Sequence, residues 1–382
     1  MIFFLKFLEK GQQSYIILVI NYSTRNFDFF LFFGTKEQQS MKVKKLEHLK
    51  IPLKDILLGT HNFNQDCHIG SGGYGSVYRA ELKMKSRDGL TETSNIVAIK
   101  RIKSREDSQG REGFLVEIDA LSKCQHPNII SLLGFCVEDN EMLLVYEHAS
   151  HGCLDSYLGS TDKMINPTWA QRLKMCIGVA NGVNYLHTTM EDKIGILHCD
   201  IKSDNILLDK NWEAKIADFG LSKFCNVNEE ASTINTMRVV GTEVYLDPEY
   251  ARTGRLKKAS DIYSLGVVLF EIFSGTLAYD SSYMRVHEKG LAPIVRKRFR
   301  NGTIKEMLDS TIMDEASELS FTIKVRPDHD SLDTFLAIAR QCIAKSQADR
   351  PTIKVVIKEL EKAFYFHVSP CLQNTVLLTV AQ

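Results

Sequence analysis

The sequence predicts an α+β fold in two lobes, in which a small β-rich lobe precedes a larger helical lobe and a cleft lies between them. Segments at 96–100, 129–136 and 142–146 have strand character, and one helical segment is expected at 111–123. Beyond residue 148 the apolar spacing becomes helical, at 169–187, 261–274, 331–343 and 352–365. The 382 residues are enough for two lobes with further residues at both ends.

The ends and the lobe boundaries follow from this pattern. We expect a leader at 1–40, an N-terminal flank at 41–62, the small lobe at 63–148, the large lobe at 149–366 and a tail at 367–382. Lys6, Glu9 and Lys10 interrupt the Phe- and Ile-rich start, whereas a membrane-spanning helix needs roughly 20 mostly apolar residues. The leader is therefore expected to be disordered or an artefact of the gene model, and no direct membrane span is predicted.

Charge and cysteine content exclude several classes of protein. The 47 Lys and Arg residues balance 47 Asp and Glu residues, so no global field favours nucleic acid or an anionic membrane. None of the nine cysteines forms a CxxC pair, which indicates reduced thiols in a cytosolic compartment. A local basic run at 296–300 is either a solvated surface or a docking patch.

A glycine-rich segment at 70–75 has the spacing GxGxxG. Glycines allow a backbone to approach phosphate oxygens without a side chain in the way. Dinucleotide-binding folds share this spacing, but there the third glycine opens a helix, whereas residues 76–80 have strand character here. A glycine-rich hairpin without a ligand remains an alternative on this segment alone. The polar stretch at 83–95 is interpreted as a hairpin loop.

Lys100 ends the apolar strand at 96–100 and offers an ammonium group for phosphate charge. Glu112 and Glu117 both lie on the expected helix at 111–123, and Glu117 falls on its apolar face. A carboxylate on an inward face is costly unless it is paired, so we expect a Lys100–Glu117 ion pair. A surface lysine and a surface glutamate are the alternative when each residue is considered singly.

The densest group of reactive side chains lies at 198–205 and 218–220. Asp200 is placed to accept or orient a hydroxyl proton, and Lys202 to stabilise charge on a transferring phosphoryl group. Asn205 and Asp218 offer oxygen ligands for magnesium. Each segment alone is compatible with a capped loop, but their order and spacing together indicate phosphoryl transfer.

Over about residues 63–366 the sequence resembles the eukaryotic protein-kinase family, and most closely the plant receptor-like and receptor-like cytoplasmic kinases. The closer likeness is carried by the segments 60–63, 143–147, 241–250 and 261–266. The resemblance implies the bilobal kinase fold with an ATP cleft, and transfer of the γ-phosphate of ATP to protein Ser or Thr hydroxyls. It also implies Mg²⁺, with Mn²⁺ as an alternative ion.

The resemblance assigns roles to individual residues. Catalysis falls to Asp200, Lys202 and Asn205, and metal binding to Asn205 and Asp218. Tyr146 is similar to the gatekeeper. The expected nucleotide-binding residues are Ile69, Gly70, Ser71, Gly72, Gly73, Tyr74, Gly75, Val77, Ala98, Lys100, Glu117, Tyr146, Glu147, Ala149 and Leu207. Among them Val77, Ala98 and Leu207 would sandwich the base, and the backbone of 147–149 would bind its edge.

Further positions concern the activation segment and the large lobe. Leu121, Leu132, His198 and Phe219 would stack into a column anchored by Asp261. Glu249 would pair with Arg350. Thr242 would lie in the substrate groove, and the candidate phosphosites are Ser222, Ser232, Thr233 and Thr236.

Cys199 departs from the family pattern because it replaces the arginine that usually precedes the catalytic Asp. A phosphate on the activation loop thus lacks its usual partner. A non-catalytic kinase-fold scaffold, or a nucleotide-gated signalling partner, is the alternative function. The resemblance further implies a protein substrate, a membrane receptor or co-receptor kinase as partner, and a cytoplasmic location that reaches the plasma membrane through that partner.

Overall fold

The computed structural model describes residues 2–9, 12–19, 46–72, 75–85, 92–102, 108–159, 166–188, 194–226, 233–284, 289–312 and 326–380. The chain divides into two compact units, Met1–His48 and Leu49–Gln382. Each unit is described by itself below.

The first unit contains an antiparallel hairpin. Strands β1 (Ile2–Glu9) and β2 (Gln12–Val19) pair from Ile2 opposite Val19 to Glu9 opposite Gln12. Both strands are rich in aromatic and β-branched residues, and two residues that include a glycine separate them in the sequence, which is a hairpin signal. That residues 1–40 are a disordered leader or an artefact of the gene model stays a prediction.

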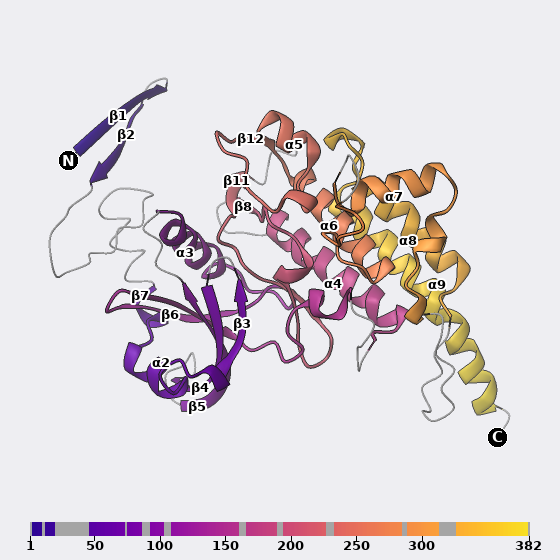
Figure 1. Cartoon of the computed structure of the whole chain (residues 1–382), viewed down its shortest axis with the longest axis horizontal. Coiled ribbons are helices and arrows are strands. Elements are labelled where there is room, and N and C mark those ends of the chain that lie inside the picture. Colours follow the sequence, from indigo (N-terminus) through magenta and orange to yellow (C-terminus); the bar gives the residue numbers. More distant parts are fainter. Residues whose placement is uncertain are drawn as a thin grey trace. The chain divides into compact units, whose positions relative to one another are not determined.

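The small lobe of the second unit is a five-stranded antiparallel sheet in the order β3-β4-β5-β7-β6 (Figure 1). Its strands are β3 (His68–Gly72), β4 (Gly75–Lys85), β5 (Glu92–Ile102), β6 (Leu132–Glu138) and β7 (Glu141–Glu147). The bounds expected for the hairpin loop, 83–95, are wrong at both ends. Pairing continues to Lys85 opposite Glu92, because ladder hydrogen bonds do not require apolar side chains.

The two faces of this sheet pack against different helices. On one face Val97, Ile99 and Val145 form a buried cluster with Leu53 and Ile56 of helix α2 (Leu53–Gly59), an element that the sequence analysis missed. Alternate residues of each strand point to the opposite face. That face receives helix α3 (Ser108–Leu121) and carries the residues of the candidate site.

The large lobe is mostly helical. It contains α4 (Trp169–Thr188), α5 (Pro248–Thr253), α6 (Lys258–Ser274), α7 (Leu291–Arg300), α8 (His329–Cys342) and α9 (Ile353–Val380). Short strands form three pairs, namely β9 (Ile206–Leu208) with β10 (Ala214–Ile216), β8 (Ile194–Leu197) with β11 (Lys223–Asn226), and β12 (Ile234–Asn235) with β13 (Arg255–Leu256). The bilobal α+β fold is thereby confirmed.

Helix α6 forms the centre of the large lobe, since every residue from Ser260 to Ser274 is buried. It ends at Gly275, whose φ of +66° is the left-handed conformation that glycine adopts readily at a helix C-terminus. The expected helices at 169–187, 261–274 and 331–343 lie close to the observed bounds of α4, α6 and α8. Helix α9 runs further than expected, and α7 was not predicted.

Among the residues that the structure describes, no helix is both long enough and sufficiently apolar to cross a membrane.

Candidate active site

A buried ion-pair cluster lies where β5 meets α3. Lys100 Nζ is 3.2 Å from Glu117 Oε2 and 2.8 Å from Asp218 Oδ1, and the Tyr146 hydroxyl donates a 2.7 Å hydrogen bond to Glu117 Oε1. The expected Lys100–Glu117 pair is therefore present. It is joined by Asp218, which is 118 residues away from Lys100 in the sequence.

The charges of this cluster stabilise one another. Burial disfavours the Lys100 ammonium, but Glu117 and Asp218 outweigh that cost and raise the pKa of Lys100. Burial likewise opposes ionisation of Asp218, yet Lys100 beside it holds the pKa of that carboxyl below its usual range. The site thus presents a fixed cation beside a fixed anion at neutral pH.

The glycine-rich turn joins β3 to β4. A Cβ atom added at Gly75 would meet the Arg101 carbonyl oxygen at 2.1 Å, so packing inside the protein requires glycine there. At Gly70 and Gly72 no atom of the described residues would lie within 4 Å of an added Cβ. The backbone at these two positions is therefore open, and a ligand could approach it closely. Of the other predicted residues of this turn, Gly73 and Tyr74 lie outside the described residues.

Ile69 and Ser71 complete the described part of the turn. Ile69 is 49% exposed, and Ser71 Oγ lies 2.8 Å from His68 Nε2. An exposed isoleucine beside open glycines offers apolar surface at the rim of the site.

Three of the predicted apolar residues of the site are half-buried. Val77 is opposite Lys100 in the sheet, and Ala98 is opposite Tyr146, so the register places these four side chains on one face. Leu207 of β9 is also half-buried, between two buried residues. The partial exposure of these three is consistent with the expected apolar binding of a base.

The segment that follows β7 is the expected hinge. The Glu147 N–H donates to the Ser131 carbonyl oxygen at 3.1 Å, and its carboxylate accepts from the Ser131 N–H and lies 3.2 Å from Lys215 Nζ. Ala149, two residues further on, is half-buried. The side chain of Glu147 therefore fixes the start of the expected hinge through Ser131 and Lys215.

The predicted catalytic loop follows β8 and surrounds Asp200 with donors. Asp200 Oδ1 accepts from the Thr242 N–H at 3.0 Å and from the Thr242 hydroxyl at 2.7 Å. Asn205 Nδ2 lies 3.2 Å from Asp200 Oδ2 and 2.9 Å from its carbonyl oxygen, and Lys202 Nζ lies 3.6 Å from Oδ2. The direct contact with Thr242, 42 residues away, was not foreseen and joins the predicted substrate groove to the predicted catalytic carboxylate.

Asp261 at the start of α6 holds this loop in place. Its carboxylate accepts from the backbone N–H groups of His198 and Cys199 at 2.9 and 3.0 Å, and it lies 2.8 Å from His187 Nε2. Burial opposes ionisation of Asp261, but these hydrogen bonds lower the pKa of its carboxyl. Cys199 has φ of +70°, a conformation that L-residues rarely adopt, and the bond to Asp261 helps to hold it.

A backbone hydrogen bond joins the segments that carry Asn205 and Asp218. The Asn205 carbonyl oxygen accepts from the Ala217 N–H at 2.8 Å, which places Asn205 beside the start of the segment that carries Asp218. The described residues contain no cluster of three or more His, Cys, Asp or Glu side chains suited to a metal ion. One carboxylate and one amide oxygen match a Mg²⁺ ion that completes its shell with water and substrate phosphates.

The column of residues expected between the lobes is built around two touching rings. His198 and Phe219 are fully buried, and their ring centroids are 4.8 Å apart in an edge-on arrangement. Leu121 is buried at the end of α3, and Leu132 is half-buried at the start of β6.

Cys199 lies in an apolar cluster with the activation segment. The cluster combines Leu197, Cys199, Cys225, Tyr250 and Leu256 with the half-buried Leu221, Ile234, Val239, Val240 and Leu246. Burial raises the pKa of the Cys199 thiol well above its ordinary value, so this thiol is a neutral packing group. At the position where an arginine was expected, the chain thus has apolar packing.

The candidate phosphosites differ in accessibility. The Ser222 hydroxyl lies 3.4 Å from the His198 carbonyl oxygen and the residue is only 3% exposed, so phosphorylation there requires local opening. The Thr236 hydroxyl lies within hydrogen-bond distance of the Tyr250 hydroxyl and the Gly254 carbonyl, and Thr233 is half-buried. Ser232 lies outside the described residues.

The prediction that Arg350 pairs with Glu249 is wrong. Arg350 pairs with Asp247, with 2.6 Å between Nη2 and Oδ1, and both side chains are almost fully buried. Glu249 instead accepts from the Gln347 N–H at 2.7 Å. Asp247 is the N-cap of α5, so its carboxylate is fixed deep in the lobe while Glu249 lies on the first turn of the helix.

Comparisons with known proteins identify the family of the chain. The protein-family model described as "Protein kinase domain" matches residues 63–361, most of the chain, and the chain therefore belongs to the protein kinase family.

Curated proteins similar to this chain include plant receptor-like protein kinases. From Arabidopsis thaliana they include the probable receptor-like protein kinase At2g23200 (40% identity, covering 82% of this chain and 34% of the relative), HERK 1 (38%, 82% and 35%) and ANXUR2 (38%, 82% and 33%). The chain spans about a third of the length of these relatives.

Proposed function

We propose that this chain is an ATP-dependent protein serine/threonine kinase that acts in intracellular signalling. The observation that carries the proposal is the Lys100 ammonium, held between Glu117 and Asp218 at 3.2 and 2.8 Å. This ion pair joins the nucleotide side of the site to the metal side, the arrangement that phosphoryl transfer needs. Membership of the protein kinase family supports the same reaction class.

Each residue of the site has its own proposed role in the reaction. Bound Mg²⁺, or Mn²⁺ in its place, would neutralise phosphate charge and would be held by Asn205 and Asp218. Lys100 would fix the nucleotide phosphates. Asp200 would accept or orient the proton of the attacking hydroxyl, which would arrive beside Thr242, the residue that donates to Oδ1.

The loop around Lys202 resembles that of Ser/Thr kinases, and this resemblance supports a Ser/Thr preference. The Lys202 ammonium lies 3.6 Å from Asp200 Oδ2, where it would stabilise charge on the phosphoryl group during transfer. Thr242 belongs to the same substrate-facing segment and contacts Asp200 directly. Phosphorylation of serine and threonine, and not of tyrosine, is the expected outcome.

Activity should not depend on a phosphate on the activation loop. An arginine before the catalytic Asp would need such a phosphate to offset its charge, whereas the neutral Cys199 packs among apolar residues that already hold the segment. Ser232, Thr233 and Thr236 are then accessory phosphosites.

The proposed setting is the plant cell surface on its cytoplasmic side. Similar proteins are named receptor-like kinases, so a membrane receptor or co-receptor kinase is the proposed partner, in addition to the protein substrate. We propose a cytoplasmic location with attachment to the plasma membrane through that partner.

The test is phosphate transfer from ATP to a generic protein such as casein, followed by phosphoamino-acid analysis. Asp218→Asn should reduce transfer at least 100-fold, and chelation of divalent metal should abolish it. Asp330→Asn, the same change at a side chain that is 77% exposed, should leave it unchanged. Full transfer by Asp218→Asn would refute the proposal, and phosphotyrosine as the main product would refute the Ser/Thr preference.

A further inference from the structure

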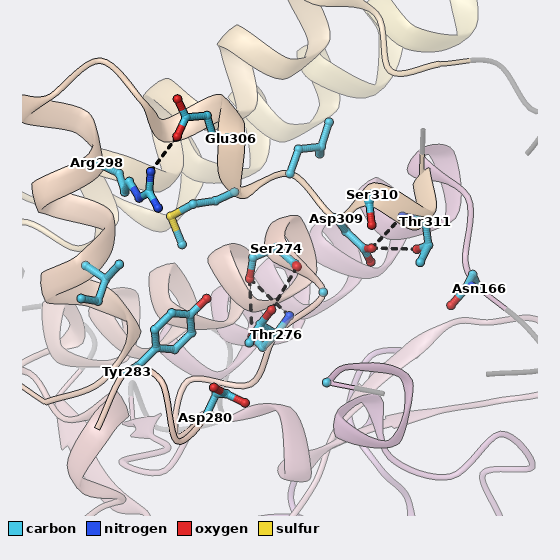
Figure 2. A pocket seen from close by; sticks show the side chains of 15 residues that line it. Asn166, Ser274, Thr276, Asp280, Tyr283, Arg298, Glu306, Asp309, Ser310 and Thr311 are labelled. Atoms are coloured by element: carbon cyan, nitrogen blue, oxygen red, sulfur yellow. Dashed lines mark hydrogen bonds and ion pairs between the residues drawn. The ribbon is translucent and has the colours of Figure 1, made fainter. Parts of the chain in front are cut away.

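The basic run of α7 has two sides with different surroundings. On one side lies a pocket of about 590 Å³ that the structure forms between the end of α6 and the segment after α7 (Figure 2). There Arg298 Nη1 lies 2.7 Å from Glu306 Oε2, and this pair appears as a dashed line in Figure 2. The charge of Arg298 is thus balanced within the chain.

On the other side, α7 and α8 enclose a groove of about 650 Å³ that continues into the segment after α8. Among the described residues that line it, Arg296, Arg300, Arg340 and Lys345 provide four cations, and Asp349 provides the one carboxylate. The groove therefore carries a formal charge of about +3 (4 − 1), although the whole chain has a net charge of zero.

Apolar residues also line the groove, and we call them its floor. It is lined by Phe299, Ala337, Ile343 and Ala344, of which Ala337 is exposed and Phe299 is half-buried. The Phe299 ring packs against Phe270 of α6, with 6.0 Å between the ring centroids. A concave apolar floor with a basic rim is suited to an extended chain that alternates acidic and apolar side chains.

Two of the cations are already ordered. Arg296 Nη1 donates to the Ile343 carbonyl oxygen at 3.2 Å, and the Arg340 guanidinium stacks 5.0 Å above the centre of the Phe299 ring. Guanidinium groups fixed in this way lose little side-chain entropy when they bind a carboxylate. The rim is therefore partly preorganised for acidic ligands.

We propose that the groove between α7 and α8 is a docking site for an acidic segment of a partner protein, with one apolar side chain on the floor and Asp or Glu side chains on the basic rim. None of the residues that line it belongs to the phosphoryl-transfer site, so docking is separate from catalysis. The concave floor favours a peptide over the flat surface of an anionic membrane.

The probe is a fluorescein-labelled peptide, Glu-Asp-Glu-Leu-Glu-Asp-Glu, titrated with the full chain and followed by fluorescence anisotropy. The chain should bind it, and affinity should fall at least tenfold from 50 to 300 mM NaCl because the contacts are ionic. The double substitution Arg300→Glu with Arg340→Glu should weaken binding at least tenfold. Ala337→Trp, which fills the floor without a charge change, should do the same.

The control is Lys354→Glu, the same kind of charge reversal at an exposed position of α9, which should change affinity less than twofold. Equal binding of the amide peptide Gln-Asn-Gln-Leu-Gln-Asn-Gln would overturn the proposal. Unchanged binding by both groove variants, with their melting temperatures retained, would also overturn it. Binding of phosphatidylserine vesicles that the groove variants abolish, without binding of the peptide, would replace it with a membrane contact.

Discussion

At the residue scale, the buried charges of the site depend on their partners. Lys100 is 13% exposed and lies between two carboxylates. Removal of one member of a buried ion pair leaves an uncompensated charge. The free-energy cost of that charge is larger than the net stabilisation that the intact pair provides. The stability of the small lobe and the geometry of the site are therefore linked at this lysine.

Lys100→Met should lower the free energy of unfolding by about 3 kcal/mol, because Glu117 and Asp218 lose their cation. Adding Glu117→Gln should restore at least about 1 kcal/mol, since one uncompensated carboxylate is then removed. Urea unfolding followed by tryptophan fluorescence measures both values. If the second change only added a further loss, the charges would not be coupled as described.

Glu271 is a buried carboxyl whose ionisation should make stability depend on pH. Its Oε1 accepts from the Tyr245 hydroxyl and the Ala278 N–H, and burial raises the pKa of the carboxyl from 4.5 to about 8. The folded state thus keeps a proton that the unfolded chain has lost. Stability from this group is full below about pH 4.5 and is lost as pH rises towards about 8.

Glu271→Gln should remove this pH dependence, since the amide does not titrate. The melting temperature of the variant relative to that of the natural chain should rise between about pH 5 and pH 8. Calorimetric melting at several pH values gives the comparison. Parallel curves for the two proteins would show that Glu271 is ionised at an ordinary pKa.

At the scale of elements, the activation segment and the catalytic loop meet at a glycine. Gly241 has φ of +124°, and a Cβ atom there would lie 2.8 Å from the Cys199 carbonyl oxygen. The next residue, Thr242, makes both hydrogen bonds to Asp200. The position of Thr242 relative to the Asp200 carboxylate thus depends on close approach of two backbones.

Gly241→Ala should reduce phosphoryl transfer at least tenfold, because the clash with Cys199 moves Thr242 away from Asp200. Gly302→Ala is the matched control, since Gly302 also has positive φ (+71°) but no neighbour of the described chain within 4 Å of an added Cβ. It should cost about 1 kcal/mol of stability and no activity. Initial rates of phosphoryl transfer and melting temperatures of the two variants test this prediction. Equal rates for the two variants would contradict the role of Gly241.

The elements show what the sequence alone was able to predict. The strongly periodic helix α4 was predicted to within one residue and α6 to within three, and the Lys100–Glu117 pair followed from the cost of an unpaired inward carboxylate. The partner of Arg350 was missed because Asp247 and Glu249 are two residues apart, and only three-dimensional packing distinguishes them. Helix α2 was missed because its burial depends on the far face of the sheet.

At the scale of the whole molecule, residues 49–382 form one compact unit that contains the complete set of site residues. The first unit contains a two-stranded hairpin, and such hairpins are marginally stable in water on their own. The stability of the kinase fold should therefore come from the second unit.

A chain that begins at Leu49 should keep its melting temperature within about 2 °C of that of the full chain, and its rate of phosphoryl transfer within twofold. Differential scanning calorimetry and the casein assay measure the two quantities. A drop of more than about 5 °C would show that residues 1–48 stabilise the second unit.

The central claim is catalysis by a chain whose activation segment needs no phosphate. The most direct measurement treats the full chain and Asp200→Asn with phosphatase, removes the phosphatase, adds Mg-ATP and casein, and quantifies phosphate by mass spectrometry. We predict phosphoserine and phosphothreonine with the natural chain and at least a 100-fold lower yield with Asp200→Asn. A nucleotide-induced thermal shift of both proteins without phosphate transfer by either would contradict the account and indicate a non-catalytic scaffold.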